Sequence, residues 1–440
     1  MIRVFYYLCF AIVLLWAARV PLRAADDPRA AEFGFEQRVR NENWNNIFDY
    51  SDRTDDQRNQ IRYRTRLWTN LPLTPKITLA AGLNQETCQV IVPRQPYRFD
   101  EVIFETAYLD IRDLFLKGLS LRVGRQNLIR GEGALIFEGT AWDGSRTIYS
   151  NAAVLSYARQ NVKVDWIGVL NPARERFLPR IHDRRRMLTE WTDQALGTYV
   201  TWKLNRNADV ESYYFYKKEV NDTRARSNPQ FQPDRHVSTA GGRLVQRLAN
   251  GWTATSEAAG QWGATHAHED IRAWYAFSHV KKEAAAKTKP YLLGGYWGFS
   301  GDNPRTPGRI EGWDPLFARW PKWSELYIYS QVKEKGAAYW TNTSLWQAEM
   351  GFQPWKPVRW RFTYYRMGAY HPFAGDPKIF AGGTSRGNMW QTRLDFTVDK
   401  HWNGHVLYEA LAPGDFYRVG SLTYFLRFEL IYTIKGHFKL

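Results

Sequence analysis

The chain has 440 residues and a formal net charge of +16 at pH 7, and aromatic residues make up 16% of it. Its mean hydropathy of −0.52 excludes a bundle of transmembrane helices, because each span needs about 20 consecutive, mostly apolar residues. A transmembrane β-barrel is not excluded, since the lumen-facing half of every barrel strand is polar. The excess of positive charge indicates an anionic partner, such as nucleic acid, lipopolysaccharide or an acidic sugar.

The start of the chain has the pattern of a secretory signal peptide. A basic start is followed by an apolar run over residues 4–18 and by small residues at Ala24 and Ala25. The run is shorter than the ~20 residues of a spanning helix, so we expect a cleaved leader over residues 1–25 and a mature domain over residues 26–440. Three arginines leave with the leader, which reduces the formal charge from +16 to +13. A secreted chain makes nucleic acid the least expected anionic partner, and we expect none.

Five segments alternate apolar and polar residues with the period of two that gives a strand two different faces. In chain order they cover residues 32–40, 60–71, 360–367, 390–398 and 422–440. The last segment is the longest, whereas strands of soluble proteins usually have about 5–6 residues. One aromatic, apolar face and one charged face suit a tilted strand between lipid and a wet lumen. These segments therefore predict strands of a membrane barrel.

The links between strands supply an independent test, because outer-membrane barrels have short periplasmic turns and longer extracellular loops. Short links are predicted near residues 70–75, 112–118, 159–161, 205–208, 249–251, 281–289, 353–357 and 399–401. Longer links alternate with them near residues 41–59, 85–100, 127–150, 170–193, 219–235, 263–270, 299–337, 369–385 and 412–420. Seventeen links make eighteen strands, provided that the strand-like segment 324–332 lies outside the wall. The sequence therefore predicts one all-β domain, an 18-stranded antiparallel transmembrane β-barrel.

A row of arginines is the main chemical feature. Arg62, Arg64 and Arg66 are spaced two apart, so their side chains share one face of a strand at intervals of about 6–7 Å. Guanidinium groups bind carboxylates in pairs and stay charged at any relevant pH. A polyuronate carries a carboxylate on every sugar, so such a row suits its passage. The alternative is structural, with ion pairs to Glu36, Glu86, Glu105 or Glu257, and the sequence leaves both open.

The same alternation assigns further residues to the lumen face. The predicted pore-lining and substrate-binding residues are Arg38, Arg40, Arg62, Arg64, Arg66, Arg122, Glu257, Gln261, Arg361, Arg393, Asp395, Arg427 and Lys435. The sequence contains no nucleophile elbow, phosphate-binding loop or zinc signature. We therefore expect no catalytic residue, no metal and no cofactor.

These segments resemble the alginate-export family of outer-membrane porins. The motifs that carry the resemblance are, in chain order, residues 33–40 (FGFEQRVR), 105–110 (ETAYLD), 124–126 (GRQ), 142–146 (WDGSR), 257–263 (EAAGQWG), 299–304 (FSGDNP) and 413–417 (PGDFY). The resemblance implies a barrel in the outer membrane of a Gram-negative bacterium, with an arginine-rich, electropositive lumen. It also implies passive export of alginate or a related anionic polysaccharide.

We expect the partners to be this polysaccharide, the lipid and lipopolysaccharide of the outer membrane, and components of a periplasmic export apparatus. We expect the barrel to be a monomer. Two alternative functions remain open at this point. One is a general or uptake porin for small anionic solutes or oligosaccharides, and the other is a secreted polysaccharide-modifying enzyme with a soluble β fold.

Overall fold

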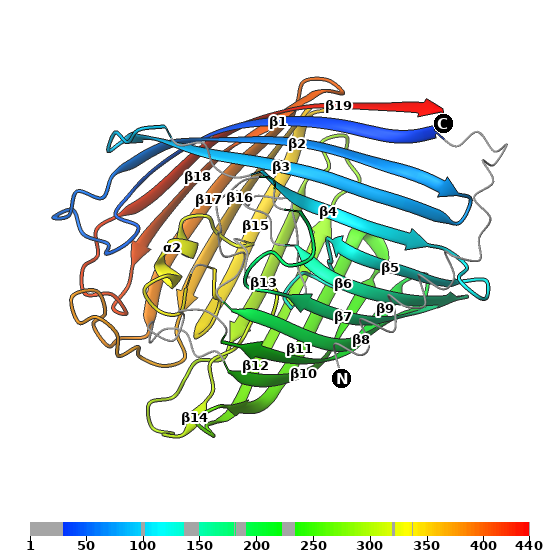
Figure 1. Cartoon of the computed structure of the whole chain (residues 1–440). Coiled ribbons are helices and arrows are strands. Elements are labelled where there is room, and N and C mark those ends of the chain that lie inside the picture. Colours follow the sequence, from blue (N-terminus) through cyan, green and yellow to red (C-terminus); the bar gives the residue numbers. More distant parts are fainter. Residues whose placement is uncertain are drawn as a thin grey trace.

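The strands form one closed wall. The computed structural model describes residues 30–97, 102–135, 149–179, 181, 191–221, 234–318, 322–336 and 338–439, so the predicted leader lies outside the described residues. Nineteen strands share one sheet, in which the two-residue β14 (Arg309–Ile310) is an addition beside β12 and the other strands pair antiparallel in chain order. The wall closes because β1 pairs with both β2 and β19 (Figure 1). The predicted 18-stranded antiparallel barrel is confirmed.

The strand boundaries confirm the predicted alternation of short and long links except around β12, where the short link 284–290 is longer than the extracellular link 266–269. The wall strands are β1 (Ala30–Asn45), β2 (Arg58–Thr74), β3 (Ile77–Val92), β4 (Val102–Ile111), β5 (Leu119–Gln126), β6 (Ser150–Arg159), β7 (Val162–Asn171), β8 (Thr192–Asn205), β9 (Ala208–Val220), β10 (Arg235–Arg247), β11 (Trp252–Thr265), β12 (Asp270–Glu283), β13 (Tyr291–Phe299), β15 (Thr343–Trp355), β16 (Val358–Gly368), β17 (Ser385–Thr397), β18 (Trp402–Pro413) and β19 (Thr423–Lys439). The 3-10 turn η2 (Ala249–Gly251) joins β10 to β11. Residues 266–269 form the shortest link at the extracellular end.

Strand β19 shows the two faces of the wall. Leu426 and Phe428 are exposed, whereas the alternate residues Arg427 and Glu429 are buried. Exposure of large apolar side chains and burial of charged ones is the reverse of a soluble strand. It is the arrangement expected when lipid covers the outside and protein fills much of the inside.

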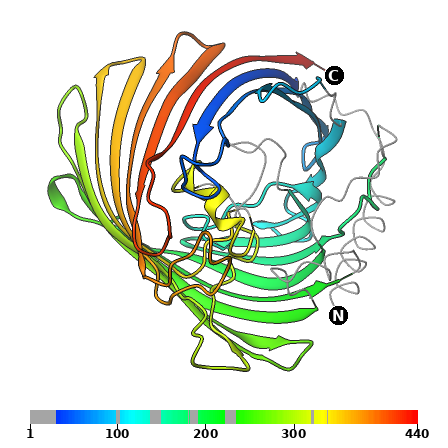
Figure 2. The same cartoon turned by 90° about the vertical axis from the view of Figure 1, so that its left-hand side faces the viewer.

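The longest link folds into the barrel. Residues 300–342, here called the β13–β15 loop, carry the short helix α2 (Tyr327–Gln331), which lies inside the ring of strands (Figure 2). The loop is fastened to the wall at several points: Gln261 on β11 donates to the backbone carbonyl of Asp314 at 2.8 Å, and Gln391 on β17 donates to that of Trp323 at 3.0 Å. The lumen is therefore partly filled rather than an open tube.

Residues 324–332 alternate like a strand in the sequence, and the structure places them outside the wall, as predicted. They contain helix α2, however, instead of a strand. The hydroxyl of Ser324 accepts the backbone N–H of Tyr327 at 2.8 Å, and the carboxylate of Glu409 on β18 accepts that of Leu326 at 2.7 Å. A side-chain oxygen and a negative charge at this end stabilise a helix. No helix among the described residues is long and apolar enough to cross a membrane.

An aromatic core joins the β13–β15 loop to the wall. Trp323 packs edge-on against Trp297 of β13, with ring centroids 5.0 Å apart, and against Trp340 at 4.6 Å. On the wall, Trp297 stacks on Phe277 of β12 at 4.1 Å. All four side chains are buried. Because each buried aromatic ring removes a large apolar surface from water, this packing holds the loop in place.

Candidate functional site

Six predicted lumen residues lie on one face of strands β1, β2 and β19, because directly opposite residues of an antiparallel pair point to the same side. The charged residues that share this face are Arg38, Arg40, Arg62, Arg64, Arg66 and Arg427, with Glu36, Glu42, Glu86 and Glu429 among them. It is the inner face, since Arg427 contacts Glu325 of the β13–β15 loop with an N···O distance of 2.8 Å.

These six arginines form an arginine–glutamate network with Glu36, Glu42, Glu86, Glu105, Glu325 and Glu429. The N···O distances are 2.7 Å for Arg64–Glu36 and Arg427–Glu42, 2.5 Å for Arg66–Glu105 and Arg40–Glu429, and 3.2 Å for Arg62–Glu86. Six positive groups therefore face six negative ones, and the formal charges of the network cancel. A buried ion needs such a partner, because leaving it alone in a low-dielectric interior is costly.

Burial divides the network into two groups. The side chains of Arg38 and Arg40 are 0% exposed and those of Arg64 and Arg427 are 1% exposed, whereas Arg62 and Arg66 are 17% and 16% exposed. The first group braces the wall and the β13–β15 loop, and only Arg62 and Arg66 reach the open lumen. The sequence suggested four glutamates as structural ion-pair partners of the arginines. Three of them, Glu36, Glu86 and Glu105, form such ion pairs in this network.

The fourth glutamate, Glu257, has a different contact. It lies on β11 and accepts a hydrogen bond from the hydroxyl of Tyr213 at 2.8 Å. Gln261 on the same strand is buried and holds Asp314 of the β13–β15 loop through two hydrogen bonds. The motif that contains both residues thus positions the loop, and Gln261 is shielded from any solute in the lumen.

The remaining predicted residues lie nearer the periplasmic ends of the strands. Arg122 pairs with Asp110 at 3.3 Å and Arg393 pairs with Asp395 at 2.9 Å. Arg361 lies opposite Arg393 in the register and is half-buried. The side chains of Arg122 and Asp395 are 41% exposed, and Lys435 is exposed. These side chains are accessible from the lumen, unlike most of the arginine–glutamate network.

The register adds five basic residues that the sequence reasoning missed. Lys163, Lys203, Arg247, Lys281 and Arg359 share the inner face near the same ends of their strands. An available signal was the alternation in residues 162–166, where Lys163 and Asp165 separate three apolar residues. We call these five residues, with Arg122, Arg393 and Lys435, the basic mouth.

Most of the basic residues in the basic mouth form an ion pair with an acidic residue. The N···O distances are 3.1 Å for Lys163–Asp165, 2.5 Å for Arg247–Asp209 and 2.8 Å for Lys281–Glu283. Lys203, Arg359 and Lys435 are exposed, and none of them forms an ion pair with another residue in the described part of the chain. The mouth therefore keeps positive charge that the protein does not neutralise.

Further inside the lumen, the link between β5 and β6 contacts both strand β10 of the wall and the β13–β15 loop. Glu132, in the link between β5 and β6, contacts Arg243 of β10 at 2.5 Å and Lys322 of the β13–β15 loop at 3.4 Å. Burial alone would raise the pKa of Glu132, but Lys322 and Arg243 hold that pKa below its usual value. All three side chains keep some exposed surface, so this contact borders the open lumen.

Arg125 has a structural role that alternation did not reveal. It is buried, donates to the side-chain oxygen of Asn151 at 3.0 Å and pairs with Glu175 at 2.7 Å. Gly124 before it has a φ of 128°, a conformation that L side chains rarely adopt, and a Cβ there would clash with the backbone carbonyl of Ala107. The motif at residues 142–146 lies outside the described residues.

The family profile for alginate export matches residues 29–424. The chain belongs to the alginate export family. The resemblance seen in the sequence is thereby confirmed, and family and fold together make the protein a porin-like channel of the Gram-negative outer membrane. A comparison with curated protein sequences found no match.

Solved structures of similar fold are outer-membrane proteins of Pseudomonas aeruginosa. OpdK, crystallised with vanillate, is 11% identical, with 92% of this chain and 99% of that chain covered and a TM-score of 0.55. OccK2 (OpdF), crystallised with glucuronate, is 11% identical, with coverage of 92% and 98% and a TM-score of 0.57. OccK5 (OpdH) matches equally well, at 11% identity, coverage of 92% and 98% and a TM-score of 0.57. At these identities the likeness shows the shared fold alone.

Proposed function

We propose that this channel passively conducts an anionic polysaccharide or oligosaccharide of the polyuronate class, and that it works in export. Family membership supports the class of substrate. The observation that carries the proposal is the basic mouth, where Lys203, Arg359 and Lys435 are exposed to the lumen and form no ion pair with another described residue. Uncompensated positive charge in a confined entrance concentrates anions and raises their rate of capture.

Further inside, the polymer would meet Arg62 and Arg66, which keep exposed surface while paired with glutamates. A uronate carboxylate can approach the exposed surface of these guanidinium groups while the glutamates remain in place. Conduction requires binding that is favourable enough for capture and weak enough for release. Contacts shared along the lumen satisfy both conditions better than one deep site. The proposal includes no chemical step.

The filled lumen favours a second candidate function, a porin for small anionic solutes or oligosaccharides. The buried aromatic core around Trp323 and the contact of Glu132 with Lys322 leave limited room beside the β13–β15 loop. A single extended polysaccharide chain and a small organic anion both suit such a passage. We further propose that the barrel acts as a monomer and receives polymer from a periplasmic export apparatus.

Conductance of the purified protein in planar lipid bilayers tests the proposal. Polyuronate added to the periplasmic side should interrupt the ion current in events whose frequency falls with salt, because mobile ions screen exposed charges within about 10 Å at 0.1 M. A neutral glucan of equal length is the control and should interrupt it far less often. If polyuronate leaves the current unchanged while small anions pass freely, the second candidate stands and the polysaccharide channel fails.

A further inference from the structure

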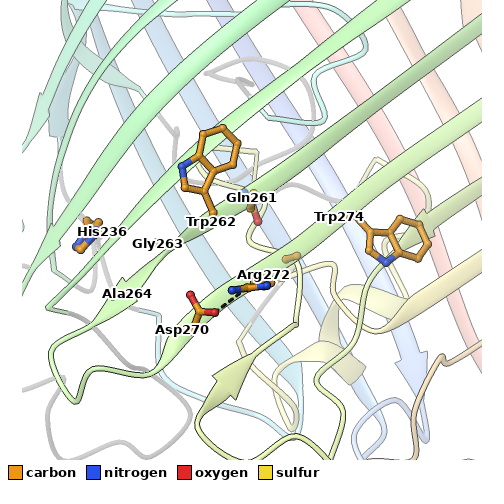
Figure 3. A pocket seen from close by; sticks show the side chains of 9 residues that line it. His236, Gln261, Trp262, Gly263, Ala264, Asp270, Arg272 and Trp274 are labelled. Atoms are coloured by element: carbon orange, nitrogen blue, oxygen red, sulfur yellow. Dashed lines mark hydrogen bonds and ion pairs between the residues drawn. The ribbon is translucent and has the colours of Figure 1, made fainter.

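A shallow hollow of about 650 Å³ lies on the outer surface of the barrel, at the extracellular ends of strands β10 to β12. Its lining includes the side chains of His236, Trp262, Asp270, Arg272 and Trp274 (Figure 3). The hollow faces away from the lumen, because Gln261 points inward to the β13–β15 loop and the next residue of a strand, Trp262, points to the opposite side. The register pairs Trp262 with Arg272, so Arg272 also points outward.

The height of the hollow follows from strand β12. Ten residues separate Arg272 from Lys282, which lies on the same outer face at the periplasmic end and is paired in the register with Trp252. Ten residues span about 33 Å along a strand, and a tilt of about 45° reduces this to a height of about 23 Å. The apolar band of an outer-membrane barrel is about 25 Å tall. Arg272 and Lys282 therefore mark the two membrane interfaces, with Arg272 in the outer leaflet.

The side chains of the hollow suit a phosphate group. Arg272 is 64% exposed and contacts Asp270 through its Nε, at 2.6 Å. No other polar partner of its guanidinium group is present in the described part of the chain, so its terminal nitrogens face the headgroup layer. Such a group binds phosphate in a bidentate manner. Trp262 and Trp274 flank it and are exposed, as expected for indole rings at a membrane interface.

Further basic groups extend the site across the neighbouring strands. His236 of β10 lies opposite Lys218 of β9 on one side and Ala264 of β11 on the other, and Ala264 lies opposite Asp270. Strands are about 4.8 Å apart, so the basic row spans about 15 Å of the rim. The link between β11 and β12 at this end, residues 266–269, is short.

We propose that this hollow binds a phosphate group of lipopolysaccharide in the outer leaflet, with Arg272 as the main ligand, Lys218 as a supporting charge and His236 as a hydrogen-bonding side chain. The glycolipid sugar would lie against Trp262 and Trp274. Lipopolysaccharide is the phosphate-bearing lipid of this leaflet, and a cation at an interface attracts anionic headgroups. Asp270 weakens the site, because its carboxylate repels phosphate and occupies one guanidinium nitrogen. The site lies outside the lumen and is independent of the transported solute.

The test measures binding of lipopolysaccharide to purified protein in nanodiscs of phosphatidylcholine, in buffer with EDTA so that divalent cations do not bridge acidic groups. Arg272→Gln should weaken binding about tenfold, the effect of one charge-assisted hydrogen-bonded contact. Asp270→Asn should strengthen it. Lys282→Gln is the matched control, since it removes a similar charge from the same strand and face in the inner leaflet, and it should change nothing.

Four results would overturn the proposal. The first three are that Arg272→Gln weakens binding less than twofold, that dephosphorylated lipopolysaccharide binds as tightly as the intact glycolipid, or that phosphatidylglycerol competes as well as lipopolysaccharide does. Loss of binding in Lys282→Gln equal to that in Arg272→Gln would show a nonspecific lipid shell instead. Folding is checked for each variant by its heat-modifiable migration in electrophoresis. Ion conductance of Arg272→Gln should equal that of the wild type, which separates this proposal from the one on transport.

Discussion

Replacement of Arg40 by Gln tests whether the buried arginines brace the barrel rather than line its pore. Arg40 is 0% exposed and its guanidinium group lies 2.5 Å from the carboxylate of Glu429. Breaking a buried ion pair from one side costs about 3–5 kcal/mol, because the remaining charge stays in the interior. Glu429 keeps two other neighbours, Arg38 at 3.8 Å and His405 at 3.2 Å, so we expect about 3 kcal/mol, the lower end of that range.

Urea unfolding in detergent, followed by tryptophan fluorescence, measures this loss in the free energy of unfolding. The double variant Arg40→Gln with Glu429→Gln removes both charges and should recover part of the loss, but not all of it, because Glu429 is also a neighbour of the buried Arg38. Arg247→Gln, an exposed lumen arginine, is the control and should leave stability within about 0.5 kcal/mol of the wild type. Anion selectivity of Arg40→Gln should be unchanged. The reasoning is refuted if Arg40→Gln unfolds like the wild type, or if its selectivity falls as far as that of variants in the basic mouth.

Three further predictions concern the lumen. The triple variant Lys203→Gln, Arg359→Gln and Lys435→Gln should lower both the anion-to-cation permeability ratio and the frequency of polyuronate block at 0.1 M salt. Lys282→Gln on the outer face is the control and should leave both quantities unchanged. An unchanged permeability ratio in the triple variant would show that the basic mouth does not select ions. Glu132→Gln should raise conductance and current noise, because it frees the β5–β6 link from Arg243 and Lys322. The pKa of Glu132 lies below its usual value, so its charged contact is present above about pH 4.5 and is lost as the pH falls through that lowered pKa. The conductance difference between Glu132→Gln and the wild type should therefore stay constant from pH 8 to pH 5 and vanish only in stronger acid; a difference that vanishes near neutral pH would contradict the assignment. Trp323→Ala should cost about 3–5 kcal/mol of stability and widen the passage, and an unchanged conductance would show that the aromatic core does not restrict it.

Much of the wall was predictable because each strand carries its own signal. In β19 the alternation of Leu426 and Phe428 with Arg427 and Glu429 identifies both faces without any knowledge of neighbouring strands. Link lengths then fixed the number of strands. The helix α2 was missed because its start depends on Glu409, a carboxylate 83 residues further along the chain.

The site was less predictable, since burial depends on what fills the lumen. Alternation places Arg64 and Arg66 on the same face, yet Arg64 is covered and Arg66 keeps exposed surface. The difference comes from partners on other strands and from the β13–β15 loop, which the period of two does not encode. The contact of Glu132 with Lys322 joins residues 190 positions apart and has no local signal.

Release of labelled oligouronates from proteoliposomes tests the central claim most directly. Vesicles that contain the wild-type channel should release the oligomers at a rate that rises with the amount of protein, and vesicles that contain the triple mouth variant should release them several times more slowly. Protein-free vesicles set the background. Retention of the oligomers in vesicles that release chloride at full rate would contradict a polyuronate channel.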